Sequence, residues 1–303
     1  MTTLAVLGVG KIGGEVAFLS SLLGLADELI IYDAAAEFLR AQLLDLQHTG
    51  IDVAISTDHR LVKDADVCVF SAGLPRNQNI KSRTDLLNAN LPVATQCSSA
   101  LRGFGGVLIT VTNPMDENNY YLYKKIGLEP RQCIGFGGQI DGARFGLIMG
   151  EYGLSGTPWV LGEHGEHQVP LFSPLDGSAP EETRDAVLDR LRGASMEVIK
   201  GKGGTVFGPS WHIASLIRAV VSDAGKTIGC SCVLDGEYGL SRCSLGVPAR
   251  IGREGILGIE EWELDEWERR HMDDAGAYVT GICNALGLFD VAMKLEFSNV
   301  ERP

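Results

Sequence analysis

The sequence contains no run of about 18 uncharged apolar residues, the length that a membrane-spanning helix requires. Its first residues, Met1-Thr-Thr-Leu-Ala-Val-Leu-Gly8, also lack the basic stretch that opens a secretory signal. We therefore expect a cytoplasmic protein that does not associate with membranes.

Positive charge is scarce. Lysine and arginine number 26 against 39 aspartates and glutamates, which gives a formal net charge of −13. Such an excess of negative charge opposes nonspecific attraction to nucleic acid. We expect no nucleic-acid partner, and an anionic substrate would have to be attracted by a local cluster of arginines.

No Cys-x-x-Cys pair occurs among the seven cysteines, which are scattered mostly through apolar surroundings. An odd, unpatterned set fits reduced, buried thiols and supports no disulfide framework. His164, Glu166 and His167 have residue types that bind metals, but no further cluster of histidine or cysteine completes a zinc set. We therefore expect no bound metal.

Short apolar runs alternate with amphipathic stretches through the first half of the chain, as is typical of parallel strands joined by crossover helices. The pattern predicts strands at 4–7, 29–32, 66–70 and 107–111, with helices near 12–24, 35–47 and 83–101. These repeated units predict an α/β fold that begins with a Rossmann domain, a doubly wound parallel sheet.

The pattern becomes less regular after Asn113-Pro114, where short strands are predicted at 133–136 and 159–162 around a helix near 140–152. Helices near 181–200 and 209–225, a glycine-rich β section over 228–256 and a closing helix near 263–286 follow. A chain of 303 residues has the length of roughly two domains. We expect domains over 1–140 and 141–303, the second α+β, packed as one unit.

Gly8-Val-Gly-Lys-Ile-Gly13 follows the first predicted strand and opens a helix, the context in which Gly-x-Gly-x-x-Gly indicates a dinucleotide site. Gly8 permits a tight turn, Gly10 lets the backbone approach a pyrophosphate, and Gly13 lets the helix pack on the sheet. Asp33, at the end of the second strand, can bind an adenine-ribose diol and would repel a 2′-phosphate. Alternatively, Asp33 only caps the next helix. We expect NAD as the cofactor, with NADP less favoured.

Asp141 and Arg144 lie three residues apart in the segment 139–145, and His164 follows in the segment 159–165. A histidine can exchange a proton near neutral pH, a carboxylate can hold its tautomer, and a guanidinium can bind a carboxylate through two parallel hydrogen bonds. By itself, the Asp141–Arg144 pair could be a helix-surface ion pair. Together the three residues predict an acid–base site with an anion clamp.

With these motifs the chain resembles the L-lactate and L-malate dehydrogenase family over nearly its full length. The resemblance implies hydride transfer between a nicotinamide and the C2 carbon of a 2-hydroxy or 2-oxo acid, in a homodimer or homotetramer. The matching segments are Gly8-Val-Gly-Lys-Ile-Gly13, Ser71-Ala-Gly-Leu-Pro-Arg76, Arg83-Thr-Asp-Leu-Leu-Asn-Ala-Asn90, Val111-Thr-Asn-Pro114, Ile140-Asp-Gly-Ala-Arg-Phe145, Leu161-Gly-Glu-His-Gly165 and Gly203-Gly-Thr205.

The resemblance also implies a role for each matching residue. His164 would be the general acid or base, Asp141 would stabilise its imidazolium, and Arg83 would polarise the C2 carbonyl. The implied substrate-binding residues are Arg76, Arg83, Asn113, Arg144 and Thr205, with Arg144 on the C1 carboxylate. The implied cofactor-binding residues are Gly8, Gly10, Lys11, Ile12, Gly13, Asp33, Ser71, Ala72, Gly73, Asn90, Val111 and Asn113.

Arg76 would decide the substrate. At this position in the family, three residues after Gly73, arginine accompanies malate or oxaloacetate and glutamine accompanies lactate or pyruvate. A second guanidinium would pair with the second carboxylate of a C4 dicarboxylate. Pyruvate has no second carboxylate and would leave the charge of this guanidinium uncompensated. The resemblance therefore favours the oxidation of (S)-malate, a step of the tricarboxylic acid cycle. The alternatives are oxidation of L-lactate or another 2-hydroxy acid and, less favoured, a noncatalytic nucleotide-binding regulator.

One departure from the family lies between Arg76 and Arg83, which enclose six residues here, one more than is common. The additional residue can redirect Arg76. For the segment 74–82 the resemblance implies a mobile loop that closes over the substrate, excludes water and carries Arg76 and then Arg83 into the site.

Overall fold

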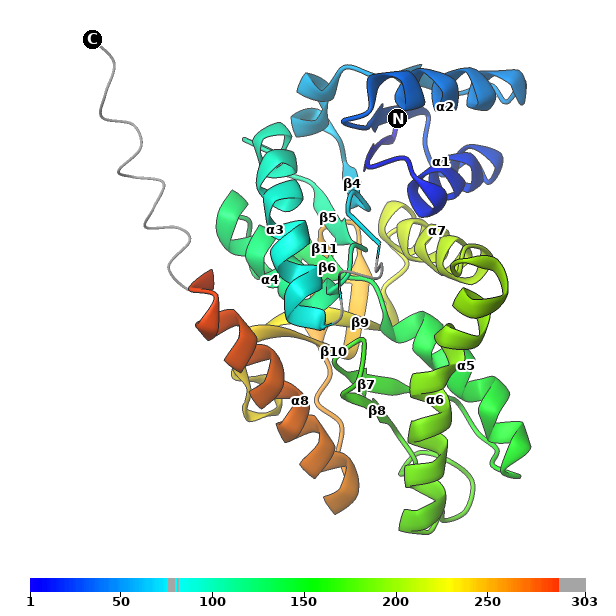
Figure 1. Cartoon of the computed structure of the whole chain (residues 1–303), viewed down its shortest axis with the longest axis vertical. Helices are drawn as coiled ribbons and strands as arrows, with labels where there is room; N and C mark the ends of the chain where they lie inside the picture. The colour runs from blue at the N-terminus through cyan, green and yellow to red at the C-terminus, as the bar shows by residue number, and fades with distance from the viewer. Residues whose placement is uncertain (76–79, 81, 289–303) are drawn as a thin grey trace.

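One mixed β-sheet runs through the computed structural model, which describes residues 1–75, 80 and 82–288 (Figure 1). Within these residues the sheet has 11 strands in the order β3-β2-β1-β4-β5-β6-β9-β10-β7-β8, with β11 paired to β10. Strands β1 to β6 pair only in parallel with one another. Because the order reverses between β1 and β4, this half is the doubly wound Rossmann arrangement, and the predicted fold class is confirmed.

The strands of the parallel half are apolar because helices cover both faces of the sheet, so that their side chains meet no water on either side. Strands β4 and β5 are buried at every position. The elements of this half are β1 (Thr3–Leu7), α1 (Lys11–Leu22), β2 (Glu28–Tyr32), α2 (Ala36–His48), β3 (Ala54–Ser56), β4 (Val67–Phe70), α3 (Arg83–Ala100), β5 (Val107–Thr110), α4 (Met115–Ile126) and β6 (Cys133–Gly135).

The second half continues the same sheet, because β9 pairs antiparallel with β6. Its elements are α5 (Gly138–Glu151), β7 (Val160–Gly162), β8 (Gln168–Pro170), α6 (Glu181–Lys202), α7 (Phe207–Val221), β9 (Lys226–Asp235), β10 (Ser241–Gly252), β11 (Gly255–Ile259) and α8 (Glu266–Ala285). The two predicted domains therefore share one sheet, while the boundary after residue 140 stays a prediction.

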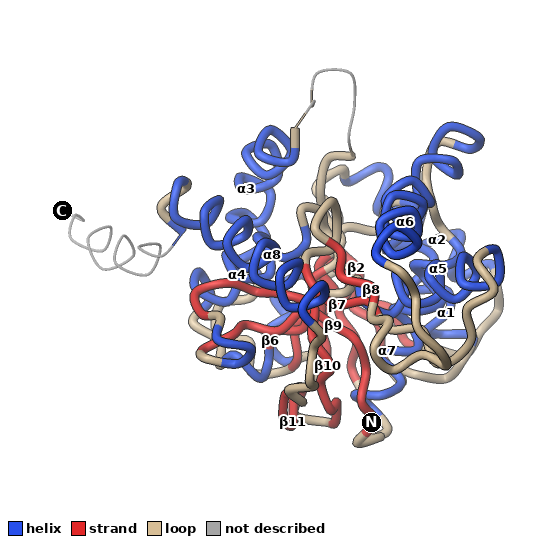
Figure 2. The backbone as a smooth tube through the Cα atoms, turned by 90° about the horizontal axis from the view of Figure 1, so that it is seen from below, coloured by secondary structure: helices blue, strands red, loops and turns tan. Residues whose placement is uncertain are grey.

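The helices form two layers around the strands. Figure 2 shows α3, α4 and α8 on one side of the sheet and α1, α5, α6 and α7 on the other. The main apolar core extends along the sheet, and a smaller one lies under α6, where Phe145, Phe172, Leu188 and Trp267 pack together. Because β1, β2, β4, β5 and β6 run parallel, their carboxyl ends lie along one edge of the sheet.

No element was predicted for residues 115–126, which form α4. Four consecutive polar residues lie near its start: Asp116, Glu117, Asn118 and Asn119. The structure buries all four side chains completely. Strands β3 and β8, each three residues long, were also missed.

The structure also shows the state of the cysteines and the character of the helices. All seven cysteines are free and buried, which confirms the prediction of buried thiols. In the part of the chain that the structure describes, no helix combines the length and the apolar character needed to cross a bilayer.

Candidate active site

The glycine loop lies at the carboxyl end of β1, where Gly8 has a φ of +87°, a conformation that favours glycine. A side chain at Gly8 would collide with the backbone of Ala72, and one at Gly13 would collide with the carbonyl of Gly8. Ser71, which follows β4, donates a hydrogen bond from Oγ to the Gly8 carbonyl at 2.7 Å. The loop is therefore held in shape by the end of the neighbouring strand.

The start of α1 is open to a ligand. A Cβ built on Gly10 would meet no atom within 4 Å, and no side chain of the described residues caps this helix. Lys11 and Ile12 form its first turn, whose backbone N–H groups and positive dipole end can bind a phosphate. The residues present thus fit the pyrophosphate of a dinucleotide.

Asp33 directly follows β2 and accepts two backbone hydrogen bonds, from Val9 at 3.2 Å and from Ala35 at 3.0 Å. Its carboxylate holds the glycine loop and also receives the N–H of the residue that precedes α2. A carboxylate has about four lone-pair sites, so acceptor positions remain for a ribose diol.

Asn90 connects the loops that follow β4 and β5. Its buried side-chain amide donates to the carbonyls of Asn113 at 2.8 Å and Leu74 at 3.3 Å, and its Oδ1 accepts from the Leu74 N–H at 2.7 Å. Gly73 leaves no room for a side chain, because a Cβ there would collide with Thr112. Asn90 therefore fixes the backbone around Gly73 and Asn113.

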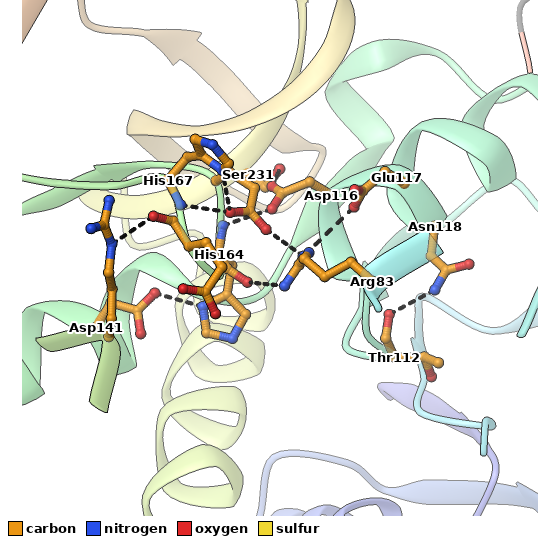
Figure 3. Close-up of polar contacts among 12 residues, drawn as sticks. Arg83, Thr112, Asp116, Glu117, Asn118, Asp141, His164, His167 and Ser231 are labelled. Atoms are coloured by element: carbon orange, nitrogen blue, oxygen red, sulfur yellow. Dashed lines mark hydrogen bonds and ion pairs between the residues drawn. The ribbon is translucent and has the colours of Figure 1, made fainter. Parts of the chain in front are cut away.

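His164 and Asp141, which were predicted to act together, are in direct contact (Figure 3). His164 lies in the turn after β7, Asp141 lies in the first turn of α5, and 2.5 Å separate Nδ1 of His164 from Oδ2 of Asp141. Arg144, one turn further along α5, donates from Nη1 to Oδ1 of Asp141 at 2.9 Å. Both oxygens of the carboxylate are occupied, and the imidazole Nε2 is the ring nitrogen left for a substrate.

The pKa values of this pair are shifted in opposite directions. Burial lowers the pKa of His164, but the charge and hydrogen bond of Asp141 raise it by more, so that it ends above the ordinary 6.5. Burial raises the pKa of Asp141, and His164 together with Arg144 overcomes this and leaves it below its usual range. Asp141 is therefore ionised, and His164 keeps its proton to a higher pH than a free histidine.

The backbone of His164 is held from two sides. Its N–H donates to Oδ2 of Asp116 at 2.8 Å, and its carbonyl accepts from Nη1 of Arg83 at 3.2 Å. Ser231 on β9 donates to the other oxygen of Asp116 at 2.6 Å. Burial and then the charges of Glu163 and Glu117 raise the pKa of Asp116 to about 7.

Arg83, the first residue of α3, points into a buried group of acids (Figure 3). Its Nη2 lies 2.5 Å from Oε1 of Glu163 and 3.8 Å from Oε2 of Glu117. Its side chain is 9% exposed, and both glutamates are completely buried. In this structure the guanidinium therefore faces protein carboxylates.

The structure brings most of the predicted site residues to one edge of the sheet. Val111 and Asn113 follow β5, and Thr205 lies in the turn before α7, a helix that packs against α1. Gly203 in that turn faces the Lys11 side chain. Arg76 and most of the predicted mobile loop, residues 76–79 and 81, lie outside the described residues.

Three residues around His164 were not among the predicted site residues: Asp116, Glu117 and Glu163. Two signals were available. Asp116 and Glu117 follow β5, whose carboxyl end lies at the ligand-binding edge of such a sheet, and Glu163 directly precedes His164. Charged residues at those two places are candidates for contact with the site.

Comparisons with known proteins agree with this geometry. Residues 2–135 match the family model described as lactate/malate dehydrogenase, NAD binding domain, and residues 147–284 match the lactate/malate dehydrogenase, alpha/beta C-terminal domain. The chain is 34% identical over 296 residues to a malate dehydrogenase of Natronomonas pharaonis, which covers 91% of this chain and 96% of that protein. It is 30% identical over 302 residues to an L-lactate dehydrogenase of Geobacillus thermodenitrificans, covering 92% and 95%.

A solved structure described as malate dehydrogenase from Archaeoglobus fulgidus in complex with NADH superposes with a TM-score of 0.84 at 30% identity. The superposition covers 94% of this chain and 100% of that one. The resemblance inferred from the sequence motifs is confirmed: the chain belongs to the lactate/malate dehydrogenase family, a family of NAD-dependent oxidoreductases.

Proposed function

We propose that this protein is a malate dehydrogenase that interconverts (S)-malate and oxaloacetate with NAD. The observation that carries the proposal is the contact between His164 and Asp141 beside Arg144, an acid–base pair next to an anion-binding group. Relatives at 32–34% identity that bear the name malate dehydrogenase support this choice of substrate.

His164 moves the proton in this proposal. During reduction its Nε2 donates to the C2 oxygen, and during oxidation the same atom accepts the hydroxyl proton. Asp141 stabilises the imidazolium and holds the proton on Nδ1 while Nε2 is neutral. The bound nicotinamide supplies the hydride for reduction and accepts it for oxidation.

Arg144 binds the C1 carboxylate. Its Nη1 is engaged by Asp141, and within the described residues its other guanidinium nitrogens donate to no protein acceptor. The side chain is 19% exposed, so it can present these nitrogens to a ligand. Two parallel hydrogen bonds from a rigid fork would orient the C2 carbon in a way that lysine could not. Asn113 and Thr205 complete the proposed pocket, and Arg83 polarises the C2 oxygen.

The proposed cofactor site comprises the glycine loop, the loops after β4 and β5, and Asp33. Backbone N–H groups of Gly10, Lys11 and Ile12 would bind the pyrophosphate, and Asp33 would accept hydrogen bonds from the adenine ribose. Ser71 and Asn90 hold the loops in place through the contacts described above. A 2′-phosphate would meet the negative charge of Asp33, which favours NAD over NADP.

Arg76 carries the choice of substrate within the family. Its side chain would pair with the C4 carboxylate of oxaloacetate, which pyruvate lacks. The second candidate, L-lactate dehydrogenase, is favoured by the L-lactate dehydrogenase relative at 30% identity and by the additional residue between Arg76 and Arg83.

The test compares kcat/KM for oxaloacetate and pyruvate, measured by NADH oxidation at neutral pH, in wild type and in Arg76→Gln. We expect wild type to prefer oxaloacetate by about 10³-fold or more, and Arg76→Gln to lose about 10²-fold or more with oxaloacetate while pyruvate is affected little. A wild-type preference for pyruvate would establish the lactate alternative. Inactivity with both acids would reject both candidates.

We also propose a cytoplasmic homodimer or homotetramer. The seven free cysteines are in keeping with a reducing compartment. Helix α2 buries none of its residues, and its Phe38 and Leu44 are 44% and 43% exposed. A second copy of the chain that covers this helix would remove these apolar side chains from water.

A further inference from the structure

A group of buried charges lies beside the His164 loop (Figure 3). Asp116, Glu117 and Glu163 contribute three completely buried carboxylates, and Arg83 contributes one guanidinium. Arg83 faces both Glu163 and Glu117, so the charge balance of the group depends on where the Arg83 side chain lies. Yet Arg83 is also the residue proposed to contact the substrate oxygen.

Glu117 depends on Arg83 more than the other two acids do. Asp116 accepts hydrogen bonds from His164 and Ser231, and Glu163 accepts one from the N–H of His167 at 2.9 Å. Neither carboxylate oxygen of Glu117 accepts a hydrogen bond from another residue in the described part of the chain. A buried carboxylate in this situation is tolerated only while a cation faces it.

We propose that Glu117 is a positioning residue that, together with Glu163, holds the Arg83 guanidinium in a retracted place from which it must leave to contact the substrate. The proposal rests on the proposed function, which gives Arg83 its substrate contact. Ser82 accepts the Asp85 N–H at 3.0 Å in a capping box that fixes the backbone at the start of α3. Only the Arg83 side chain therefore moves, from the carboxylates of Glu117 and Glu163 to the substrate oxygen.

Departure of Arg83 changes the protonation of Glu117. The groups around Glu117 are Asp116 on its own helix, Arg83 from α3, Glu163 and His167 from the β7–β8 region, and Tyr278 and Cys283 from α8. Burial already raises the pKa of Glu117, and Arg83 is the strongest opposing influence. When the guanidinium leaves, the pKa of Glu117 rises further and Glu117 binds a proton more readily. Substrate binding through Arg83 is thus linked to proton uptake, and it strengthens as pH falls.

The test is Glu117→Gln, which keeps the shape of the side chain and removes its charge. Steady-state kinetics with NADH and oxaloacetate, or whichever 2-oxo acid wild type reduces, are measured across pH. We expect KM to fall by about three- to tenfold at neutral and alkaline pH, with kcat within about twofold of wild type, because a larger fraction of the protein has Arg83 available. We also expect the pH dependence of KM to be weaker than in wild type.

The matched control is Glu166→Gln, the same chemical change at an exposed position in the loop that carries His164. It should leave KM, kcat and the pH dependence as in wild type. Circular dichroism and thermal unfolding establish that each variant is folded.

Two outcomes overturn the proposal: an unchanged KM and KM–pH profile in Glu117→Gln, or a loss of kcat and thermal stability at constant KM, which would assign Glu117 a structural role. Arg83→Lys separates this proposal from the proposed function. If Arg83→Lys lowers kcat/KM and Glu117→Gln is silent, the positioning role alone fails. If Arg83→Lys leaves kcat/KM unchanged, the substrate contact of Arg83 fails, and the positioning role fails with it.

Discussion

His164 is fixed at three points, each by a different element. Asp141 on α5 holds the imidazole and Asp116 on α4 holds the backbone N–H, while Arg83 on α3 donates to the carbonyl as long as it lies among the carboxylates. A general acid must reach the substrate oxygen within hydrogen-bond distance and in one orientation. At the scale of single residues, the site therefore depends on carboxylates that bind the histidine from both its ring side and its backbone side.

Asp141→Asn tests the contact between Asp141 and the imidazole ring of His164. Without the carboxylate the pKa of His164 falls, because the group that raises it is gone. The protonated form needed for reduction is then lost at a lower pH. We expect the alkaline limb of kcat/KM for oxaloacetate reduction to move about one unit or more toward acid, with kcat about 10²- to 10⁴-fold lower.

The measurement is a kcat/KM–pH profile, with NADH affinity determined by fluorescence titration. NADH affinity should stay close to wild type, because nucleotide binding uses other groups. A profile with an unchanged alkaline limb would show that Asp141 does not set the pKa of the catalytic acid.

Helix α4 shows what could and could not be predicted from the sequence at the scale of elements. Strands β1, β2, β4 and β5 were predicted within about a residue because continuous apolar runs between turn signals have one common structural meaning. Helix α4, which contains the polar run Asp116 to Asn119, was not predicted. Its burial depends on partners far away in sequence, such as Ser244, which accepts a hydrogen bond from Asn119 at 2.8 Å.

The same reasoning applies to the candidate site. The contacts of Asp141 with His164 and Arg144 agree with what the residue types and motif order predict, while the catalytic roles of the three stay predictions. For Glu117 and Glu163 the sequence gives a position after β5 and beside His164, but it does not show that their side chains turn inward. Their importance comes from meeting Arg83, which is 34 residues before Glu117 in the chain and belongs to another helix.

Asp116→Asn tests the contribution of α4 to stability. The pKa of Asp116 is about 7 in the folded protein and 3.8 in its ordinary state. Since folding raises this pKa, the folded state binds more protons than the unfolded state between these values. The contribution of protonated Asp116 to the free energy of unfolding is fully present below pH 3.8 and is lost as pH rises through about 7.

Wild type should therefore gain stability relative to Asp116→Asn on acidification, by about 2 kcal/mol between about pH 8 and about pH 5.5. The amide can still accept from His164 and can donate to Ser231, so the variant should fold. Chemical denaturation at both pH values measures the difference, and Asp52→Asn, at an exposed position, should follow wild type. If the unfolding free energies of wild type and Asp116→Asn change equally with pH, the raised pKa of Asp116 is not the source of the pH dependence.

At the scale of the whole molecule, α2 packs Leu39, Leu43 and Leu46 against the core and leaves two other large apolar side chains exposed. An amphipathic helix normally gains its stability from packing of its apolar face. Here Phe38 and Leu44 remain exposed, which is why we propose that a second copy covers α2.

Leu44→Asp should weaken that association, because a carboxylate would lose its hydration in the interface. We expect light scattering after size exclusion to show about half the wild-type mass at micromolar concentration. Leu257→Asp on β11 is the matched control, since Leu257 is 44% exposed and Leu44 is 43% exposed. A monomeric wild type, or an unchanged mass for Leu44→Asp, would contradict the proposed assembly.

The pairing of β6 with β9 predicts how the nucleotide-binding half would behave if it were expressed alone. A fragment that ends near residue 140 would present β6 as an unprotected strand edge, with free N–H and C=O groups where Ser231 and Cys232 pair in the intact chain. Such edges template association with other chains. The nucleotide-binding half, although it matches a family model of its own, should therefore aggregate when it is expressed alone. It should become soluble when the complementary half is supplied as a separate chain.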